Sequence, residues 1–276
     1  MTELLGYSFF TNAIIGVLII SVAAAMIGTY IVARRLVAIS GGVTHACFGG
    51  LGLGYYLGID PTAMAALFAV ASSLGVEWMS SRHRVREDSA IAVIWSIGMA
   101  VGVLFVFLTP GFVPELNAFL FGSILNISVA DLWLFAGYTT LLVLFFWWKF
   151  REIVICAFDR DFARVAGLPV KFVTITMTVF VALCIVLTIR LVGIMLLMSM
   201  ISLPQMTAEI FCKRFRTVML MSVFISVAGC LGGLVLSAYI DVPCSALMVI
   251  VLAGMFITGR VYSVVARKLA LRQGGV

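Results

Sequence analysis

Charged residues are scarce in this sequence. Only 11% of its 276 residues are Asp, Glu, Lys or Arg, whereas 63% are hydrophobic. Soluble globular domains carry about 25% charged and about 45 to 50% apolar residues. The composition therefore predicts an integral membrane protein. Since about 20 apolar residues form one spanning helix, eight or nine spans leave no room for a large soluble domain. Any energy source is then an ion gradient or a separate subunit.

Several motifs of catalysis are also missing. The sequence has no G-x-x-x-x-G-K-[ST] phosphate-binding loop, no H-E-x-x-H zinc-protease motif and no G-x-S-x-G nucleophile elbow. Its six cysteines include no C-x-x-C pair, and most lie in or beside apolar runs, which is typical of small buried hydrophobes. We therefore expect a non-catalytic subunit without a permanently bound cofactor.

Long apolar runs predict an all-α bundle of about nine transmembrane helices, with residues 1–276 forming a single transmembrane domain. The predicted spans are 10–33, 41–58, 61–79, 90–109, 131–148, 171–189, 191–212, 217–239 and 243–263. Because 171–189 and 191–212 are nearly continuous, eight spans are the alternative. The first ten residues, MTELLGYSFF, lack the basic stretch of a cleavable signal, so we expect the first run to be retained.

The basic residues predict the orientation. If the N-terminus lies outside, all of the 18 Lys and Arg residues except Arg190 fall on one side of the membrane. Lys and Arg concentrate in cytoplasmic connections, so that side, with the C-terminus, is expected to be cytoplasmic. Five acidic residues fall outside: Glu3, Asp60, Glu115, Asp131 and Asp241. They indicate either an acidic mouth that attracts cations or a basic partner, or ordinary solvated loops.

Two connections are long. The outer one, 110–131, contains a short apolar piece at 118–125, which predicts a re-entrant or interfacial helix because it is too short to span. The inner one, 149–171, is the longest cytoplasmic connection. Within it, Asp159–Val165 predicts a short helix with acids at its start, ended by Gly167, Leu168 and Pro169. This helix is either a docking element for a partner or an ordinary amphipathic connector.

His45 is one of two histidines and lies inside the predicted second span. At 100° per residue it shares a face with Gly49, Gly52 and Tyr56, beside a stripe of small residues that favours close helix packing. Imidazole is a common ligand of transition metals, whereas a lone buried histidine is often only hydrogen-bonded. Both interpretations of His45 stay open. The other histidine, His83, lies in a basic loop and is read as solvated.

The predicted seventh span carries polar residues on one face. These residues are Met198, Ser202, Gln205 and Glu209. Pro204 removes one backbone hydrogen bond, and the carbonyl that it frees must be satisfied by protein or water. This face is predicted to line a translocation path. The alternative is a kinked packing helix with Glu209 at the cytoplasmic interface. Glu77, at a span end, is read as an interfacial residue.

Together these segments resemble the membrane permease subunits of bacterial ABC importers for zinc, manganese and iron. Three stretches carry the resemblance: RRLVAISGGVTHACFGGLGLGYYLGIDP (34–61); FLFGSILNISVADL (119–132) with FDRDFARVAGLPV (158–170); and LVGIMLLMSMISLPQMTAEIF (191–211). They occur in the family's order and cover roughly residues 10–265. Each motif is weak alone, and their joint occurrence makes the resemblance specific.

The chain departs from the family pattern near His45. Many members carry Asp where this sequence has Gly41, and Ser where it has Thr44. The usual proline after the histidine is replaced by Gly49. His45 itself is retained, so the resemblance implies a metal role for His45 and places Thr44 along the path, with half of the Asp–His pair missing.

The resemblance implies a multi-pass protein of the prokaryotic plasma membrane that works as a homodimer. Two cytoplasmic ATP-binding subunits, on which ATP would be hydrolysed, would dock on the 158–167 helix within the cytoplasmic coupling segment 149–171. An extracytoplasmic metal-binding protein would deliver the ion. The residues implied in ATPase coupling are Phe158, Asp159, Ala163 and Gly167. Transport would proceed by alternating access, with zinc placed ahead of manganese and iron. The alternatives are a permease for a metal chelate or small organic solute, and a polytopic membrane enzyme or scaffold without nucleotide coupling. No nucleic acid is expected as a partner.

Overall fold

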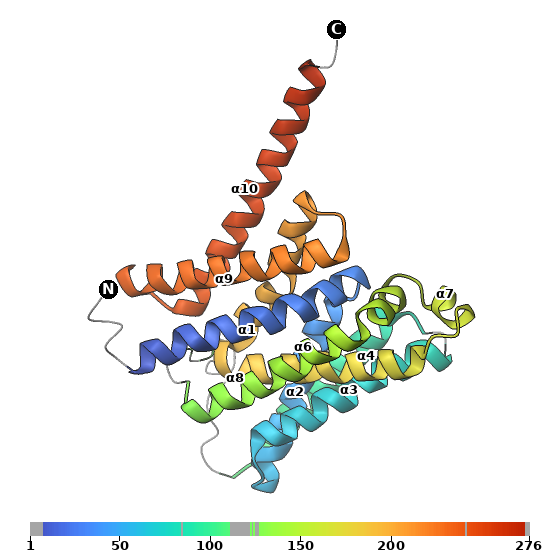
Figure 1. Cartoon of the computed structure of the whole chain (residues 1–276). Coiled ribbons are helices and arrows are strands. Elements are labelled where there is room, and N and C mark those ends of the chain that lie inside the picture. Colours follow the sequence, from blue (N-terminus) through green and yellow to red (C-terminus); the bar gives the residue numbers. More distant parts are fainter. Residues whose placement is uncertain are drawn as a thin grey trace.

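The computed structural model describes residues 8–83, 85–110, 122, 124, 127–240 and 242–273, and the regular structure of this part of the chain is helical throughout (Figure 1). The helices are α1 Ser8–Ala33, α2 Val37–Leu57, α3 Pro61–His83, α4 Glu87–Leu108, α6 Val129–Phe158, α7 Arg160–Val165, α8 Val170–Phe211, α9 Phe215–Ile240 and α10 Cys244–Gln273. The predicted all-α bundle is confirmed. Eight of the described helices are long and apolar enough to cross a membrane.

The 42-residue helix α8 is too long for one crossing. At 1.5 Å per residue it would extend about 63 Å, which is twice the bilayer core. Its backbone breaks at Gly193, where φ is 77° and ψ is 172°. Side chains with a Cβ rarely adopt this conformation, so glycine is required there.

Contacts at the two ends of α6 show that α8 crosses the bundle twice. Arg190 pairs with Asp131, at the start of α6, at 3.2 Å. Glu209, after the break, lines a cavity together with Phe158, at the end of α6. The first half of α8 therefore runs from the end of α6 to its start, and the second half returns. The predicted spans 171–189 and 191–212 are two halves of one broken helix, which reconciles eight helices with nine crossings.

The outer connection reaches this break. A Cβ on Gly122 would overlap the backbone of Val192 and Gly193, so the connection and α8 are in backbone contact. The predicted re-entrant helix at 118–125 lies almost wholly outside the described residues.

Two helices run past the predicted ends of their spans. Helix α6 kinks at Lys149, directly after the span predicted to end at 148, and continues to Phe158, so the first ten residues of the predicted cytoplasmic connection belong to α6. The last helix continues from the predicted end at 263 to Gln273 and projects from the bundle (Figure 1). In both places charged residues ended the apolar run without ending the helix, because Lys, Arg and Glu are good helix formers.

Glycines of α2 bring its backbone against two neighbours. A Cβ on Gly50 would lie 2.5 Å from the carbonyl oxygen of Met64 in α3, and a Cβ on Gly52 would lie 2.5 Å from that of Gly102 in α4. Such distances exclude any side chain, so α2, α3 and α4 form a closely packed unit. The predicted close packing of the second span is confirmed.

The backbone contact at Gly52 predicts that even a single added methyl group destabilises the protein there. We expect Gly52→Ala to lower the stability of the protein by about 1 to 3 kcal/mol, because the backbones must move apart. The matched control is Gly137→Ala in α6, where an added Cβ meets no atom within 4 Å and alanine favours the helix. Thermal unfolding in detergent measures both. Equal midpoints for the two variants would contradict the close packing.

Candidate functional site

His45 lies on α2 and packs flat against α4. Its ring stacks on Trp95 with centroids 4.5 Å apart and an interplanar angle of 4°. Within the described residues, no three His, Cys, Asp or Glu side chains gather to hold a metal ion. Among these residues, His45 therefore does not belong to a ready-made cluster of metal ligands.

Met198 brings the polar face of α8 to the His45 segment. A Cβ on Gly41, one helical turn before His45, would lie 3.2 Å from the Cε of Met198. Thr44 is fully buried, and its hydroxyl has no hydrogen-bond partner among the described residues. Thus the segment of α2 that carries Thr44 and His45 meets α8 at Met198, while the ring of His45 itself faces Trp95 of α4.

Gln205 has a different setting. It is fully buried, and its Nε2 donates to the carbonyl of Met200 at 3.3 Å. Met200 is four residues before Pro204, so this is the carbonyl that the proline leaves without its helical donor. The same Nε2 lies 3.3 Å from the carbonyl of Ala24 and 3.4 Å from that of Ala25, both in α1. The expectation that protein satisfies the freed carbonyl is confirmed, and Gln205 does so between α8 and α1.

The other two residues of the predicted face are also placed. The hydroxyl of Ser202 donates to the carbonyl of Met198 at 2.7 Å, within its own helix. Glu209 is exposed and lines a cavity of about 440 Å³ that also contains Lys213, Arg260 and Arg267. The four predicted residues therefore follow the second half of α8 from the His45 region to a basic end of the bundle, and Gln205 alone turns into the α1 contact.

The short helix α7 forms as predicted. Asp159 caps it by accepting from the backbone N–H groups of Asp161 at 3.0 Å and Phe162 at 2.9 Å. Gly167 ends it with φ at 72°, and Leu168 N–H donates to the carbonyl of Ala163 at 3.0 Å. Ala163 is fully buried and seats the helix.

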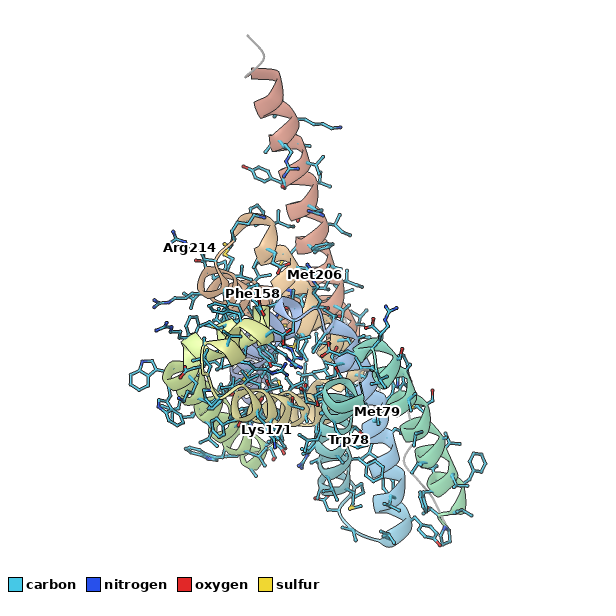
Figure 2. All side chains as sticks on the ribbon, turned by 90° about the vertical axis from the view of Figure 1, so that its right-hand side faces the viewer. Trp78, Met79, Phe158, Lys171, Met206 and Arg214 are labelled. Carbon is cyan, nitrogen blue, oxygen red and sulfur yellow. The ribbon has the colours of Figure 1, made fainter. Side chains whose placement is uncertain are left out.

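The exposed face of α7 and its flanking residues is apolar. Phe158, Phe162 and Val165 are 66%, 59% and 89% exposed. Figure 2 faces the end of the bundle that carries α7, called the α7 end here, and shows Phe158 and Lys171 on it. Exposed apolar groups of this kind at the end of a membrane bundle are typical of a protein contact.

Four charged side chains form an ion-pair cluster at the α7 end. Arg34 follows α1, Glu77 lies in α3, Glu87 begins α4 and Arg160 begins α7. The guanidinium of Arg160 lies 2.9 Å from Glu77 and 3.9 Å from Glu87. That of Arg34 lies 3.1 Å from Glu87 and 3.8 Å from Glu77. Each carboxylate thus faces both guanidinium groups, and the cluster joins the ends of four helices.

Arg34 is the most buried member, since its side chain is only 6% exposed. It also donates to the hydroxyl of Tyr30 at 3.1 Å. Burial alone lowers the pKa of Arg34, but Tyr30, Glu77 and Glu87 raise it above its ordinary value, so the guanidinium stays charged.

Sequence reasoning missed this cluster. It used the arginines only as markers of orientation and read Glu77 as interfacial. The available signal was weak: two glutamates stand at span ends on the side that carries most of the basic residues, but the sequence does not say which arginines they meet.

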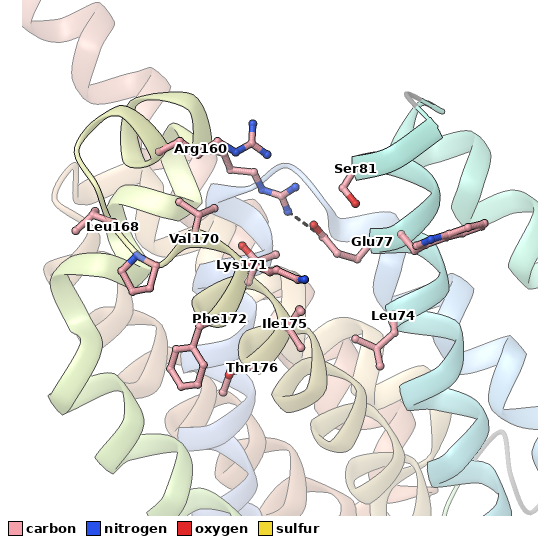
Figure 3. Close-up of a pocket in the computed structure, with 14 residues that line it drawn as sticks. Leu74, Glu77, Ser81, Arg160, Leu168, Val170, Lys171, Phe172, Ile175 and Thr176 are labelled. Carbon is pink, nitrogen blue, oxygen red and sulfur yellow. Dashed lines mark hydrogen bonds and ion pairs between the residues drawn. The ribbon is translucent and has the colours of Figure 1, made fainter.

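A cavity of about 1360 Å³ lies beside the cluster, between α3 on one side and α7 with the start of α8 on the other (Figure 3). Glu77, Trp78 and Ser81 come from the α3 side, and Arg160, Arg164 and Lys171 come from the opposite side. In Figure 3 the ion pair between Arg160 and Glu77 crosses this space.

The eight long apolar helices, the broken helix α8 and the glycine-packed α2 define a multi-pass helical membrane protein. The chain belongs to the ABC 3 transport family, whose model matches residues 6–263. Members of this family are permease subunits of ABC transporters for metal ions or metal chelates.

Similar proteins include two transport components. A probable iron transport system membrane protein of Haemophilus influenzae is 30% identical to this chain, over 95% of this chain and 97% of that protein. A manganese transport system membrane protein, MntC, of Halalkalibacterium halodurans is 26% identical over 92% of this chain and 87% of its own. Among solved structures, PsaBC from Streptococcus pneumoniae in complex with Fab has the same fold, with a TM-score of 0.81 at 23% identity and 94% coverage of both chains.

The contacts of Gln205 predict that it is needed for stability. We expect Gln205→Leu to destabilise the protein by about 1 to 3 kcal/mol, because the carbonyl of Met200 loses its donor inside the bundle. Adding Pro204→Ala restores the backbone N–H and should recover much of the loss. Thermal unfolding in detergent measures both variants, and Ser202→Ala, which removes only a bond within one turn, is the control. A Gln205→Leu protein of normal stability that transports poorly would instead make Gln205 a path residue.

Proposed function

We propose that this chain is the permease subunit of an ATP-driven importer that moves a divalent transition metal ion into the cytoplasm. The observation that carries the proposal is the family match over residues 6–263, together with relatives named for iron and manganese transport. Zinc, manganese and iron are the candidate substrates, and import is the expected direction.

The region of His45, Thr44 and Met198 supports a metal ion as substrate. It offers an imidazole, a buried hydroxyl without a partner and a thioether where α2 meets α8. These groups differ in softness, and imidazole suits zinc, iron and other transition metals. A permease must release the ion that it accepts, so a few weak ligands serve passage better than a closed tetrahedral site.

The α7 end supports a separate motor. The sequence holds no phosphate-binding loop, and the apolar face of Phe158, Phe162 and Val165 offers a contact for an ATP-binding subunit. In this proposal two copies of the chain form the path, two ATP-binding subunits dock on α7, and an extracytoplasmic binding protein delivers the metal. Asp159, Ala163 and Gly167 act indirectly, because they cap, seat and end α7.

Alternating access is the proposed mechanism. ATP binding in the partner subunits would move α7, and the bundle would tilt around the unit of α2, α3 and α4. Because backbone contacts at Gly50 and Gly52 hold this unit together, it would move as one body and carry His45 with it.

Reconstitution tests this function. We expect the chain, purified with its ATP-binding subunit and binding protein in vesicles, to take up zinc, manganese or iron only when ATP is present. Uptake is measured for each free ion and for its chelates. Transport of chelates alone would favour the second candidate, a metal-chelate permease. A chain that associates with no ATP-binding subunit would exclude an ABC importer.

Two variants distinguish a role of His45 as a metal ligand from a role in packing. We expect His45→Ala to lower metal uptake at least about tenfold, as loss of a ligand would. His45→Phe keeps an aromatic ring against Trp95 but has no nitrogen, and we expect it to be equally impaired. The control is His83→Ala, at the other histidine. Normal uptake by His45→Phe would show that His45 serves only in packing.

A further inference from the structure

We propose that the ion-pair cluster of Arg34, Glu77, Glu87 and Arg160 is the latch through which α7 acts on the bundle, and that Arg160 is its moving member. This inference rests on the proposed function, in which α7 receives the motion of an ATP-binding subunit. It assigns a positioning role to residues that touch neither the metal nor the nucleotide.

The position of Arg160 suits such a role. It is the first residue of a six-residue helix, and its guanidinium reaches Glu77, which is 83 positions away in the sequence, at 2.9 Å. The cavity beside the cluster separates α3 from α7 and the start of α8 (Figure 3). Across that space the ion pair of Arg160 with Glu77 connects the two sides.

The cluster can open without leaving a carboxylate unpaired. If Arg160 withdraws with α7, Glu77 and Glu87 both keep Arg34 as a counter-ion, at 3.8 and 3.1 Å. Arg34 is 6% exposed and fixed between them, whereas Arg160 is 22% exposed and returns readily to water. Removing the only partner of a buried charge is costly, but a shared partner lowers that cost. The arrangement therefore has two accessible states that differ in the position of Arg160.

The cluster is connected to the region of His45 by direct contacts. Glu77 belongs to α3 and Glu87 to α4, and these two helices are in backbone contact with α2 at Gly50 and Gly52. Glu87 and Trp95 lie on the same helix, and Trp95 stacks on His45. A displacement of Arg160 thus reaches the metal region through ion pairs and close-packed helices, without a flexible segment between them.

The test measures metal uptake per ATP hydrolysed by the whole complex in vesicles. We expect Arg160→Gln to assemble and hydrolyse ATP, but to transport roughly 2- to 30-fold less metal per ATP, the range that corresponds to coupling energies of this kind. Glu77→Gln should behave alike, and Arg160→Lys, which keeps the charge, should regain part of the loss. The matched control is Arg190→Gln, because Arg190 makes an ion pair of the same kind with Asp131, at 3.2 Å, at the opposite end of the bundle.

Three results would overturn the inference. The first is an Arg160→Gln complex that transports as much metal per ATP as the wild-type and Arg190→Gln complexes. The second is a loss of assembly or thermal stability that accounts for the whole defect, which would make the cluster a structural clamp. The third is a wild-type complex without ATP-dependent uptake. That result refutes the proposed function. If instead the wild-type and Arg160→Gln complexes transport the same amount of metal per ATP, only the latch is refuted.

Discussion

Lipid offers no hydrogen-bond partners, so a polar group inside this bundle is costly unless protein or water satisfies it. Gln205 satisfies the carbonyl freed by Pro204 and reaches α1 at the same time. The hydroxyl of Tyr138 in α6 donates to the carbonyl of Phe180 in α8 at 2.7 Å. Charge follows the same rule at the α7 end, where two arginines and two glutamates neutralise one another.

The second principle of construction is contact between backbones. Apolar side chains gain nothing by leaving lipid for one another, so helices in a membrane associate where small residues let them approach closely. Here Gly50 and Gly52 give α2 that property toward α3 and α4. Hydrogen bonds and ion pairs connect helices at particular residues, whereas glycine contacts hold whole helices close together. The region of His45 belongs to the closely packed unit of α2, α3 and α4.

The sequence predicted the architecture well, because its signals are local. Apolar runs, the capping residue Asp159 and the turn at Gly167 act within a few residues, and the helices and α7 formed where they predicted. The kinked extension of α6 and the length of α10 were missed because charged residues end an apolar run in the sequence but do not end the helix. The ion-pair cluster could not be predicted, since Arg34 and Arg160 meet the glutamates only when four chain segments converge. The roles of His45 and the α8 face stay predictions.

The break at Gly193 joins two crossings of the membrane through a single residue. A loop of several residues would absorb a shift of one helix without passing it on. A one-residue joint has no slack, so the two crossings can change their mutual angle only through a few backbone torsions near that glycine. The first crossing begins beside α7 and the second ends beside Phe158, at the same end of the bundle. The two crossings therefore share one joint, at the opposite end of the bundle from α7, and any change in the angle between them is centred on that joint.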